Sequence, residues 1–216
     1  MLDFTSVIPY MPLLLKGAMV TVQFSVLALL FGTVLGIFIG ALRVAPNRFI
    51  SGIAASYIYV IRGTPLLIQL YFIYFGLPSI GIYLSAFVSG VLGLTIKSAG
   101  YIGEIVRGGV EAIPKGQWEA GKVLGLSHEK TLRYIILPQA LRNMLPPLGN
   151  EFVTLIKESS LLSTIAIVEL TMAGQQIRSR TFASFETFIV IGLIYLFMTS
   201  VTSLLLRQIE KRWNVN

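Results

Sequence analysis

Residues 17–42 of the chain read GAMVTVQFSVLALLFGTVLGIFIGAL and contain no charged side chain. A transmembrane helix needs about 20 predominantly apolar residues to cross the hydrocarbon core of a bilayer. This stretch therefore predicts a membrane-spanning helix. The whole composition agrees, because 55% of the residues are hydrophobic, 12% are charged and the mean hydropathy is +0.78, whereas soluble domains carry about 25% charged residues. We expect an integral membrane protein.

Four further apolar stretches predict additional spans, so that we expect an all-α integral membrane protein with about five transmembrane helices. They lie at Leu66 to about Phe75, on a run that begins near Ile50, at Leu84 to Ile105, at Pro146 to Leu170 and at Thr187 to Leu206. No change in composition marks a second domain, so residues 1–216 are expected to form a single transmembrane domain. The first residues lack the basic region of a signal peptide, and we expect the first apolar segment to remain in the mature protein.

The basic residues predict the orientation, because Lys and Arg gather on the cytoplasmic side of membrane proteins. With five spans, one face receives Arg43, Arg48, the six basic residues from Arg107 to Arg142, and Arg207, Lys211 and Arg212. The other face receives Lys16, Arg178 and Arg180. We therefore expect the N-terminus outside, the C-terminus inside, and a cytoplasmic loop at about residues 108–138.

That loop contains Glu119-Ala120-Gly121, then Gly125, then Ile135-Ile136-Leu137-Pro138. We expect a short helix that presents a surface to a partner protein, with Gly125 ending it in a left-handed conformation. An amphipathic helix lying on the lipid surface is the alternative. The residues expected to form the docking surface are Trp118, Glu119, Ala120, Gly121, Leu124 and Gly125.

The spacing of this loop is similar to the EAA loop of ABC-importer permeases, in which E-A-(A/G)-x-x-x-G is followed about ten residues later by I-x-L-P. Gly121 stands where a second alanine is commoner. Flanking motifs at residues 62–66 (RGTPL), 104–108 (EIVRG) and 157–161 (KESSL) resemble those of permeases for polar amino acids. The resemblance implies that the short helix is a coupling helix, seated in a groove of an ATPase subunit.

The same resemblance implies the partners. Such an importer contains two ABC ATPase subunits, which bind ATP and magnesium, two permease subunits and an extracytoplasmic solute-binding protein. This chain is then a multi-pass transport subunit of the inner membrane without a cofactor or enzymatic activity of its own. We expect a homodimer of permeases, with a related sister permease as the alternative, and alternating access driven by the ATPase. The rival hypothesis is a self-sufficient channel or secondary transporter that uses intramembrane carboxylates.

Ionisable residues inside predicted spans are costly to insert and therefore mark candidate substrate-binding residues. The candidates are Lys97, Tyr101 and Glu104 on one helical face, Glu151, Thr154 and Glu158 on a face of a second helix with Lys157 beside them, and Gln69 one turn beyond the helix break at residues 62–65. Two such faces can bind the ammonium and carboxylate of an amino acid. The alternative is that the charges form ion pairs that fix helix register. The excess of acidic groups favours arginine, lysine or histidine as the solute.

Missing residues exclude other functions. The phosphate loop G-x-x-x-x-G-K-(S/T) does not occur, so this chain does not bind ATP by that route. With no cysteine, one histidine (His128) and one aspartate (Asp3), it has neither a Ser-His-Asp site nor a metal centre, and His128 is expected to be a solvated loop residue. The net charge of +7 follows from topology rather than from nucleic-acid binding. Gly32, Gly36 and Gly40 predict close helix packing within the chain.

Overall fold

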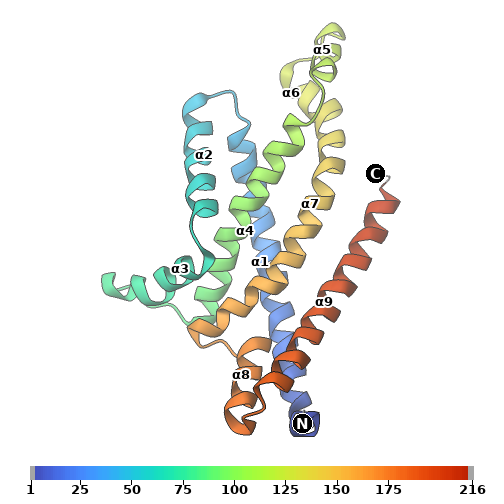
Figure 1. The fold of residues 1–216 in the computed structure, drawn as a ribbon. Coiled ribbons are helices and arrows are strands. Elements are labelled where there is room, and N and C mark those ends of the chain that lie inside the picture. The colour runs from blue at the N-terminus through green and yellow to red at the C-terminus, as the bar shows by residue number, and fades with distance from the viewer. Residues whose placement is uncertain (1–2, 214–216) are drawn as a thin grey trace.

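The computed structural model describes residues 3–213, and within that range the chain consists of helices without a β-strand (Figure 1). The long helices are α1 (Met11–Arg43), α4 (Ala86–Glu111), α7 (Leu137–Glu158) and α9 (Ser184–Arg212). The shorter ones are α2 (Arg48–Gly63), α3 (Leu66–Tyr71), α5 (Lys115–Val123), α6 (His128–Thr131) and α8 (Leu170–Thr181). The predicted all-α fold is confirmed. The ends of the expected single domain, residues 1–2 and 214–216, lie outside the described range.

Helices α1 and α4 form the centre of the molecule, and α7 packs along α4 (Figure 1). Gly32, Gly36 and Gly40 bring the backbone of α1 directly against α4. A Cβ atom added to Gly36 would lie 2.6 Å from Cβ of Ile102, which is closer than two carbon atoms can approach. Close backbone packing of this kind holds helices together in lipid, where the hydrophobic effect does not. The predicted packing of the glycine stripe within the chain is confirmed.

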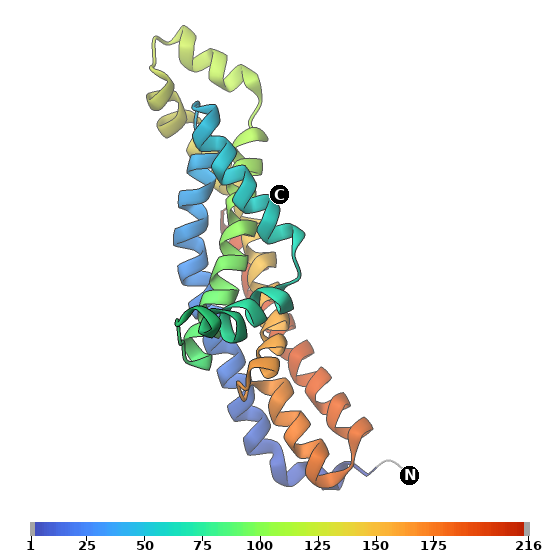
Figure 2. The same cartoon turned by 90° about the vertical axis from the view of Figure 1, so that its left-hand side faces the viewer.

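The second apolar run is broken at residues 62–65, as predicted, and α2 and α3 meet there with a bend of 102° (Figures 1 and 2). Pro65 cannot donate the backbone hydrogen bond that would continue α2. The side chain of Gln69 stabilises the bend, because its Nε2 donates to the carbonyl oxygens of Ile61 (2.9 Å) and Thr64 (3.2 Å). We call this bend the elbow.

The expected span from Pro146 to Leu170 is wrong in its bounds. Helix α7 begins earlier, contains the proline pair 146–147 in its interior and ends at Glu158. The following segment, Ser159–Ile165, is a 3-10 helix. Its hydroxyl groups donate to carbonyl oxygens three residues earlier, namely Ser159 to Ile156, Ser163 to Ser160 and Thr164 to Leu161. Such local bonds compete with the α-helical pattern, and the span therefore ends before the apolar sequence does.

Three of the described segments are long and apolar enough to cross a membrane, namely Phe4–Arg43, α4 and α9, and the bent α2–α3 pair makes a fourth if it is counted as one span. Helix α7 does not reach this criterion, although it packs beside α4, because charged side chains such as Arg142 and Glu151 interrupt its apolar surface. By length and composition the described residues thus hold three or four candidate spans, and the expected count of five stays a prediction. The orientation of the chain stays a prediction.

Helices α5 and α6 project from the end of the molecule opposite to the N-terminus (Figures 1 and 2). The predicted short helix in the loop is α5, and the predicted left-handed glycine follows it, since Gly125 has a φ of +72°. The N–H of Gly125 donates to the carbonyl oxygen of Lys122, and the N–H of Leu126 donates to that of Gly121, both at 3.0 Å. These two bonds form a Schellman motif, which fixes the end of α5.

Candidate functional site

A buried lysine joins the two predicted polar helix faces. Its Nζ, on Lys97 of α4, lies 3.0 Å from Oε1 of Glu151 and 2.8 Å from Oε2 of Glu158, both on α7. The two carboxylates lie on one side of α7 because seven residues make about two helical turns. Lys97 and Glu151 are almost fully buried, whereas 28% of the Glu158 side chain is exposed. With both carboxylates ionised the three groups have a formal net charge of −1, and Glu158 is the member whose side chain reaches the surface.

Beside this cluster lies a cavity of about 400 Å³ at the elbow, which we call the elbow cavity. Its lining residues are Ile61, Arg62, Gly63, Thr64, Pro65, Leu66, Lys97, Tyr101 and Glu158. Nζ of Lys97 lies 4.1 Å and Cζ of Arg62 lies 5.3 Å from the centre of the Tyr101 ring. Cations are attracted to aromatic rings at such distances. The cavity thus combines a carboxylate, cations, an aromatic ring and irregular backbone, all of which can contact a polar solute.

The other predicted substrate residues lie outside this cavity. Gln69 is turned into the elbow, where it bonds the backbone. Glu104 is nearer to α5 and pairs with arginines. The hydroxyl of Thr154 donates to the backbone one turn earlier, at 2.9 Å. Lys157 lines a groove between α7 and α9. The structure therefore brings together Lys97, Tyr101, Glu151 and Glu158, and it separates the remaining four from them.

Two of the predicted docking residues face the protein itself. The ring of Trp118 stacks on His128 with 4.8 Å between ring centroids, so that His128, although exposed, has an aromatic partner that was not predicted. Gly121 is buried against α6, where an added Cβ would lie 2.4 Å from Cγ2 of Thr131. This contact explains why the loop has glycine rather than alanine at position 121, because the buried Thr131 fills the space of an alanine methyl group.

The other side of α5 is open. Glu119, Ala120 and Leu124 are exposed. Val123, which was not among the predicted docking residues, is 87% exposed, and the neighbouring Leu124 is 71% exposed. Two exposed aliphatic side chains at a rigid helix end are a surface that a partner can cover. The large exposed apolar side chains of α5 therefore lie at its C-terminal end rather than around Trp118.

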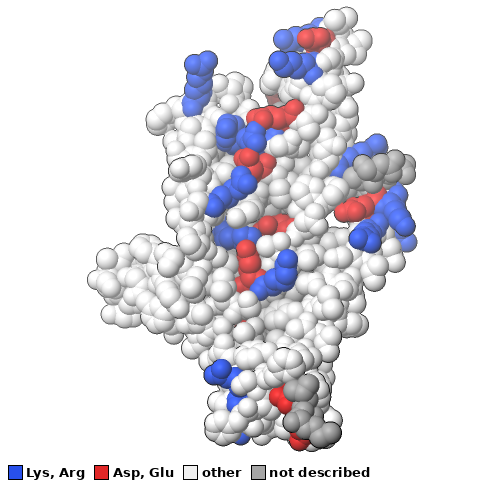
Figure 3. Space-filling model, in the orientation of Figure 1, with Lys and Arg blue, Asp and Glu red and all other residues white. Residues whose placement is uncertain are grey.

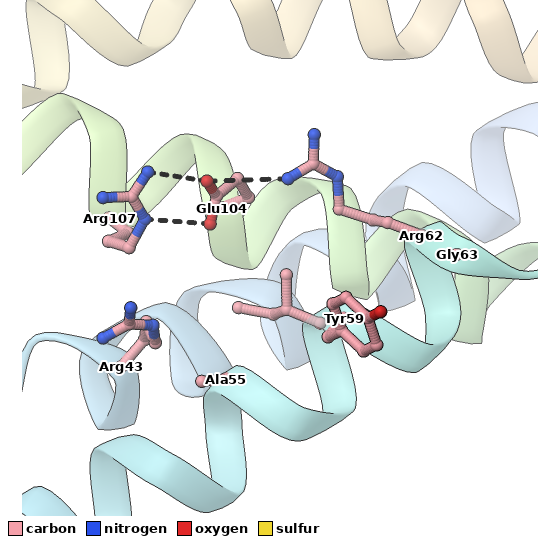
Figure 4. Close-up of a pocket in the computed structure, with 8 residues that line it drawn as sticks. Arg43, Ala55, Tyr59, Arg62, Gly63, Glu104 and Arg107 are labelled. Atoms are coloured by element: carbon pink, nitrogen blue, oxygen red, sulfur yellow. Dashed lines mark hydrogen bonds and ion pairs between the residues drawn. The ribbon is translucent and has the colours of Figure 1, made fainter.

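A second group of charges extends from the elbow cavity towards α5, and Figure 3 shows Lys or Arg and Asp or Glu side chains alternating along this face. Arg107 donates to both carboxylate oxygens of Glu104, at 2.9 and 2.6 Å, and also pairs with Glu111. Nη1 of Arg62 lies 3.5 Å from Glu104 (Figure 4). These arginines were not among the predicted site residues. The one signal that could have found them is their repeated position directly before a glycine, at residues 62–63 and 107–108.

Long apolar helices, buried charges beside a broken helix and a projecting surface helix together define a membrane transport subunit. Residues 32–215 match the sequence model of a family described as "Binding-protein-dependent transport system inner membrane component". The match covers most of the chain, and the chain belongs to this family. It is a permease subunit of an ABC importer.

Similarity to individual relatives agrees with this family assignment. The chain is 42% identical over 215 residues to the glutamine transport system permease protein GlnP of Escherichia coli (strain K12), across 99% of this chain and 98% of that protein. It is 35% identical over 216 residues to the arginine transport system permease protein ArtQ of Bacillus subtilis (strain 168), across 100% of this chain and 99% of that protein. A crystal structure of an amino acid ABC transporter with histidines contains a chain that is 43% identical, with a TM-score of 0.94 and coverage of 98% and 99%.

Proposed function

We propose that this permease subunit serves polar amino acids and that the elbow cavity binds the amino acid during its passage. The observation that carries the proposal is Lys97, buried between Glu151 and Glu158 at the wall of a cavity. The cluster has one negative charge more than it has positive charges, and Glu158 is its exposed member. A cationic side chain of the solute at Glu158 would neutralise that charge. Of the substrates in the relatives' names, glutamine and arginine, arginine carries such a side chain, so the surplus charge favours a basic amino acid.

We infer the partners of the chain from the family to which it belongs. A separate ATPase subunit, present in two copies, binds ATP with magnesium and carries out hydrolysis. An extracytoplasmic solute-binding protein delivers the amino acid, and a second copy of this chain completes the pathway in the inner membrane. This assembly requires the α5 end to be cytoplasmic and the N-terminal end to face outward, as the basic residues predict. The exposed Val123 and Leu124 and the fixed end of α5 support docking of this helix on the ATPase.

In this mechanism the chain provides a binding place and a gate. ATP binding closes the pair of ATPase subunits, each α5 follows its ATPase, and the interface between the two permeases opens outward. ATP hydrolysis reverses the movement and exposes the elbow cavity to the cytoplasm. The side chains of this chain attract and orient the solute; they take part in no covalent step.

The test is to replace Glu158 with Gln, which keeps the volume and removes the charge. The complex is reconstituted in vesicles with the ATPase and the binding protein, and uptake of arginine and of glutamine is measured. We expect Glu158→Gln to reduce arginine uptake far more than glutamine uptake. Glu210→Gln, on α9 away from the cavity, is the matched control and should leave both rates unchanged.

If uptake of both amino acids is unchanged in Glu158→Gln, the charge cluster is structural and the solute passes elsewhere. Uptake that continues without ATP and follows a proton gradient would instead support a secondary transporter that uses the same carboxylates. These two outcomes are distinct, because the first concerns the residue and the second concerns the energy source.

A further inference from the structure

A second cavity, of about 460 Å³, lies on the α5 side of the elbow cavity. Figure 4 shows the residues that line it. Its lining residues are Arg43, Ala55, Ile58, Tyr59, Arg62, Gly63, Glu104 and Arg107. We call it the arginine cavity. It is formed by α1, α2 and α4, and its volume falls within the range of about 300–1,000 Å³ that is typical of small-molecule sites. Three guanidinium groups around one carboxylate are an unusual lining for a membrane helix bundle, where charges are costly.

The arginines differ in how well they are neutralised. Arg107 has two carboxylate partners, Glu104 and Glu111, and Arg62 has a longer contact of 3.5 Å with Glu104. Among the residues that the structure describes, Arg43 has no carboxylate within ion-pair distance, and its Nη1 donates to the hydroxyl of Ser51 at 2.9 Å. The cavity therefore keeps a surplus of positive charge at Arg43 and Arg62 next to the negative charge of Glu104.

Arg62 connects the two cavities. This side chain and Gly63 line both of them. On the elbow side the guanidinium of Arg62 lies over the ring of Tyr101, and on the other side it pairs with Glu104. The Arg62 side chain is 43% exposed, so it is not held by surrounding packing. A partly exposed side chain that lines both cavities can contact a solute in either one.

We propose that the arginine cavity is a second, transient binding site for the amino acid, which the solute occupies after it leaves the elbow cavity towards the α5 end. Arg43 and Arg62 bind the α-carboxylate, and Glu104 binds the ammonium group. The Arg62 side chain, which lines both cavities, moves with the solute from the elbow cavity to the arginine cavity. The assignment rests on the proposed function, because it requires an amino acid to reach the elbow cavity first. The guanidinium groups of Arg43 and Arg62 are suited to binding the α-carboxylate of the solute, since the planar fork of donors in a guanidinium matches a carboxylate.

Substrate protection of single cysteines tests the two cavities separately, because the chain has no native cysteine. Tyr59→Cys reports on the arginine cavity and Thr64→Cys on the elbow cavity. Ser56→Cys is the control, since it is exposed on α2 one turn from Tyr59 and lines neither cavity. The complex is placed in phosphatidylcholine nanodiscs without ATP, and labelling by a maleimide is timed with and without arginine or glutamine.

We expect either amino acid to slow labelling of both Tyr59→Cys and Thr64→Cys and to leave Ser56→Cys unchanged. Adding Arg43→Gln should raise the concentration needed to protect Tyr59→Cys about tenfold, because a lost charge-assisted hydrogen bond has about that effect on affinity. Protection of Thr64→Cys should not change. Arg48 is an exposed arginine at the N-terminal end of α2, and Arg48→Gln should not change the protection of either cysteine.

Each other outcome overturns the proposal in a recognisable way. Protection of Thr64→Cys without protection of Tyr59→Cys would leave the proposed function intact and remove the second site. Protection of neither cysteine would remove both. If phosphatidylglycerol, added without amino acid, protects Tyr59→Cys and amino acids do not, the arginine cavity binds an anionic lipid headgroup. If Arg43→Gln does not change the concentration needed to protect Tyr59→Cys, the Arg43 side chain does not bind the solute.

Discussion

The replacement of Lys97 by methionine should strongly destabilise the chain. The change keeps an unbranched side chain as far as Cε and removes the ammonium group that lies 3.0 Å from Glu151 and 2.8 Å from Glu158. Glu158 is 28% exposed, but Glu151 is only 5% exposed and would be left buried without its cationic partner. Removing one partner of a buried pair costs about 3–5 kcal/mol. For a chain of this size that corresponds to a fall in the unfolding temperature of about 6–20 °C.

The assay is thermal unfolding of the purified chain in detergent, followed by size-exclusion chromatography of the fraction that remains folded. Lys130→Met, on the exposed surface of α6, is the control and should unfold at the wild-type temperature. Replacing Glu151 with Met in the Lys97→Met background should recover most of the loss, because a buried ion pair can be exchanged for apolar side chains at little cost. If Lys97→Met is as stable as the wild type, or if the second change recovers nothing, Lys97 does not neutralise Glu151 in the folded chain.

Three further results are expected. Gly121→Ala should displace α6, at a cost of about 1–3 kcal/mol for an overpacked contact, and should therefore weaken co-purification of the ATPase. Adding Thr131→Ala should restore co-purification. Failure of that rescue would contradict the contact between the two residues. Gly125→Val places a branched side chain at a φ of +72°, which costs about 1–2 kcal/mol. Uptake of the amino acid should therefore fall while membrane insertion is kept. Normal uptake would argue against a docking role for α5. In intact cells a membrane-impermeant maleimide should label Ser179→Cys and spare Ser127→Cys, and the reverse pattern would invert the predicted orientation.

The sequence predicts those parts of the fold that depend on a single segment. Uncharged apolar runs located α1 and α9, proline and glycine located the elbow, and one glycine located the end of α5. Each of these features is governed by local backbone chemistry or by the length that a bilayer requires. Local signals failed at α7, where a proline pair that looks like a boundary lies inside the helix, and where hydroxyl groups end it before the apolar run ends.

The site was harder to predict because it depends on how helices are rotated against one another. Helical spacing correctly placed Lys97 and Tyr101 on one face, but it could not show that one lysine contacts both Glu151 and Glu158. It also could not show that Glu104 belongs to a separate cavity. In α5 the sequence could not show that Trp118 faces inward, since that depends on its stacking partner, His128, in the next helix. Contacts between distant segments carry no signal in one sequence.

The distance along the chain between Lys97 and Glu151 also affects how the protein is made. The two residues are 54 positions apart, so at about 5–20 residues per second roughly 3–10 s pass between the synthesis of the first and the second. During that interval α4 carries a lysine without its carboxylates, which costs about 2.5–3.5 kcal/mol at the centre of an inserted helix. We therefore expect α4 to reach its stable position only after α7 has been made and its carboxylates can pair with Lys97.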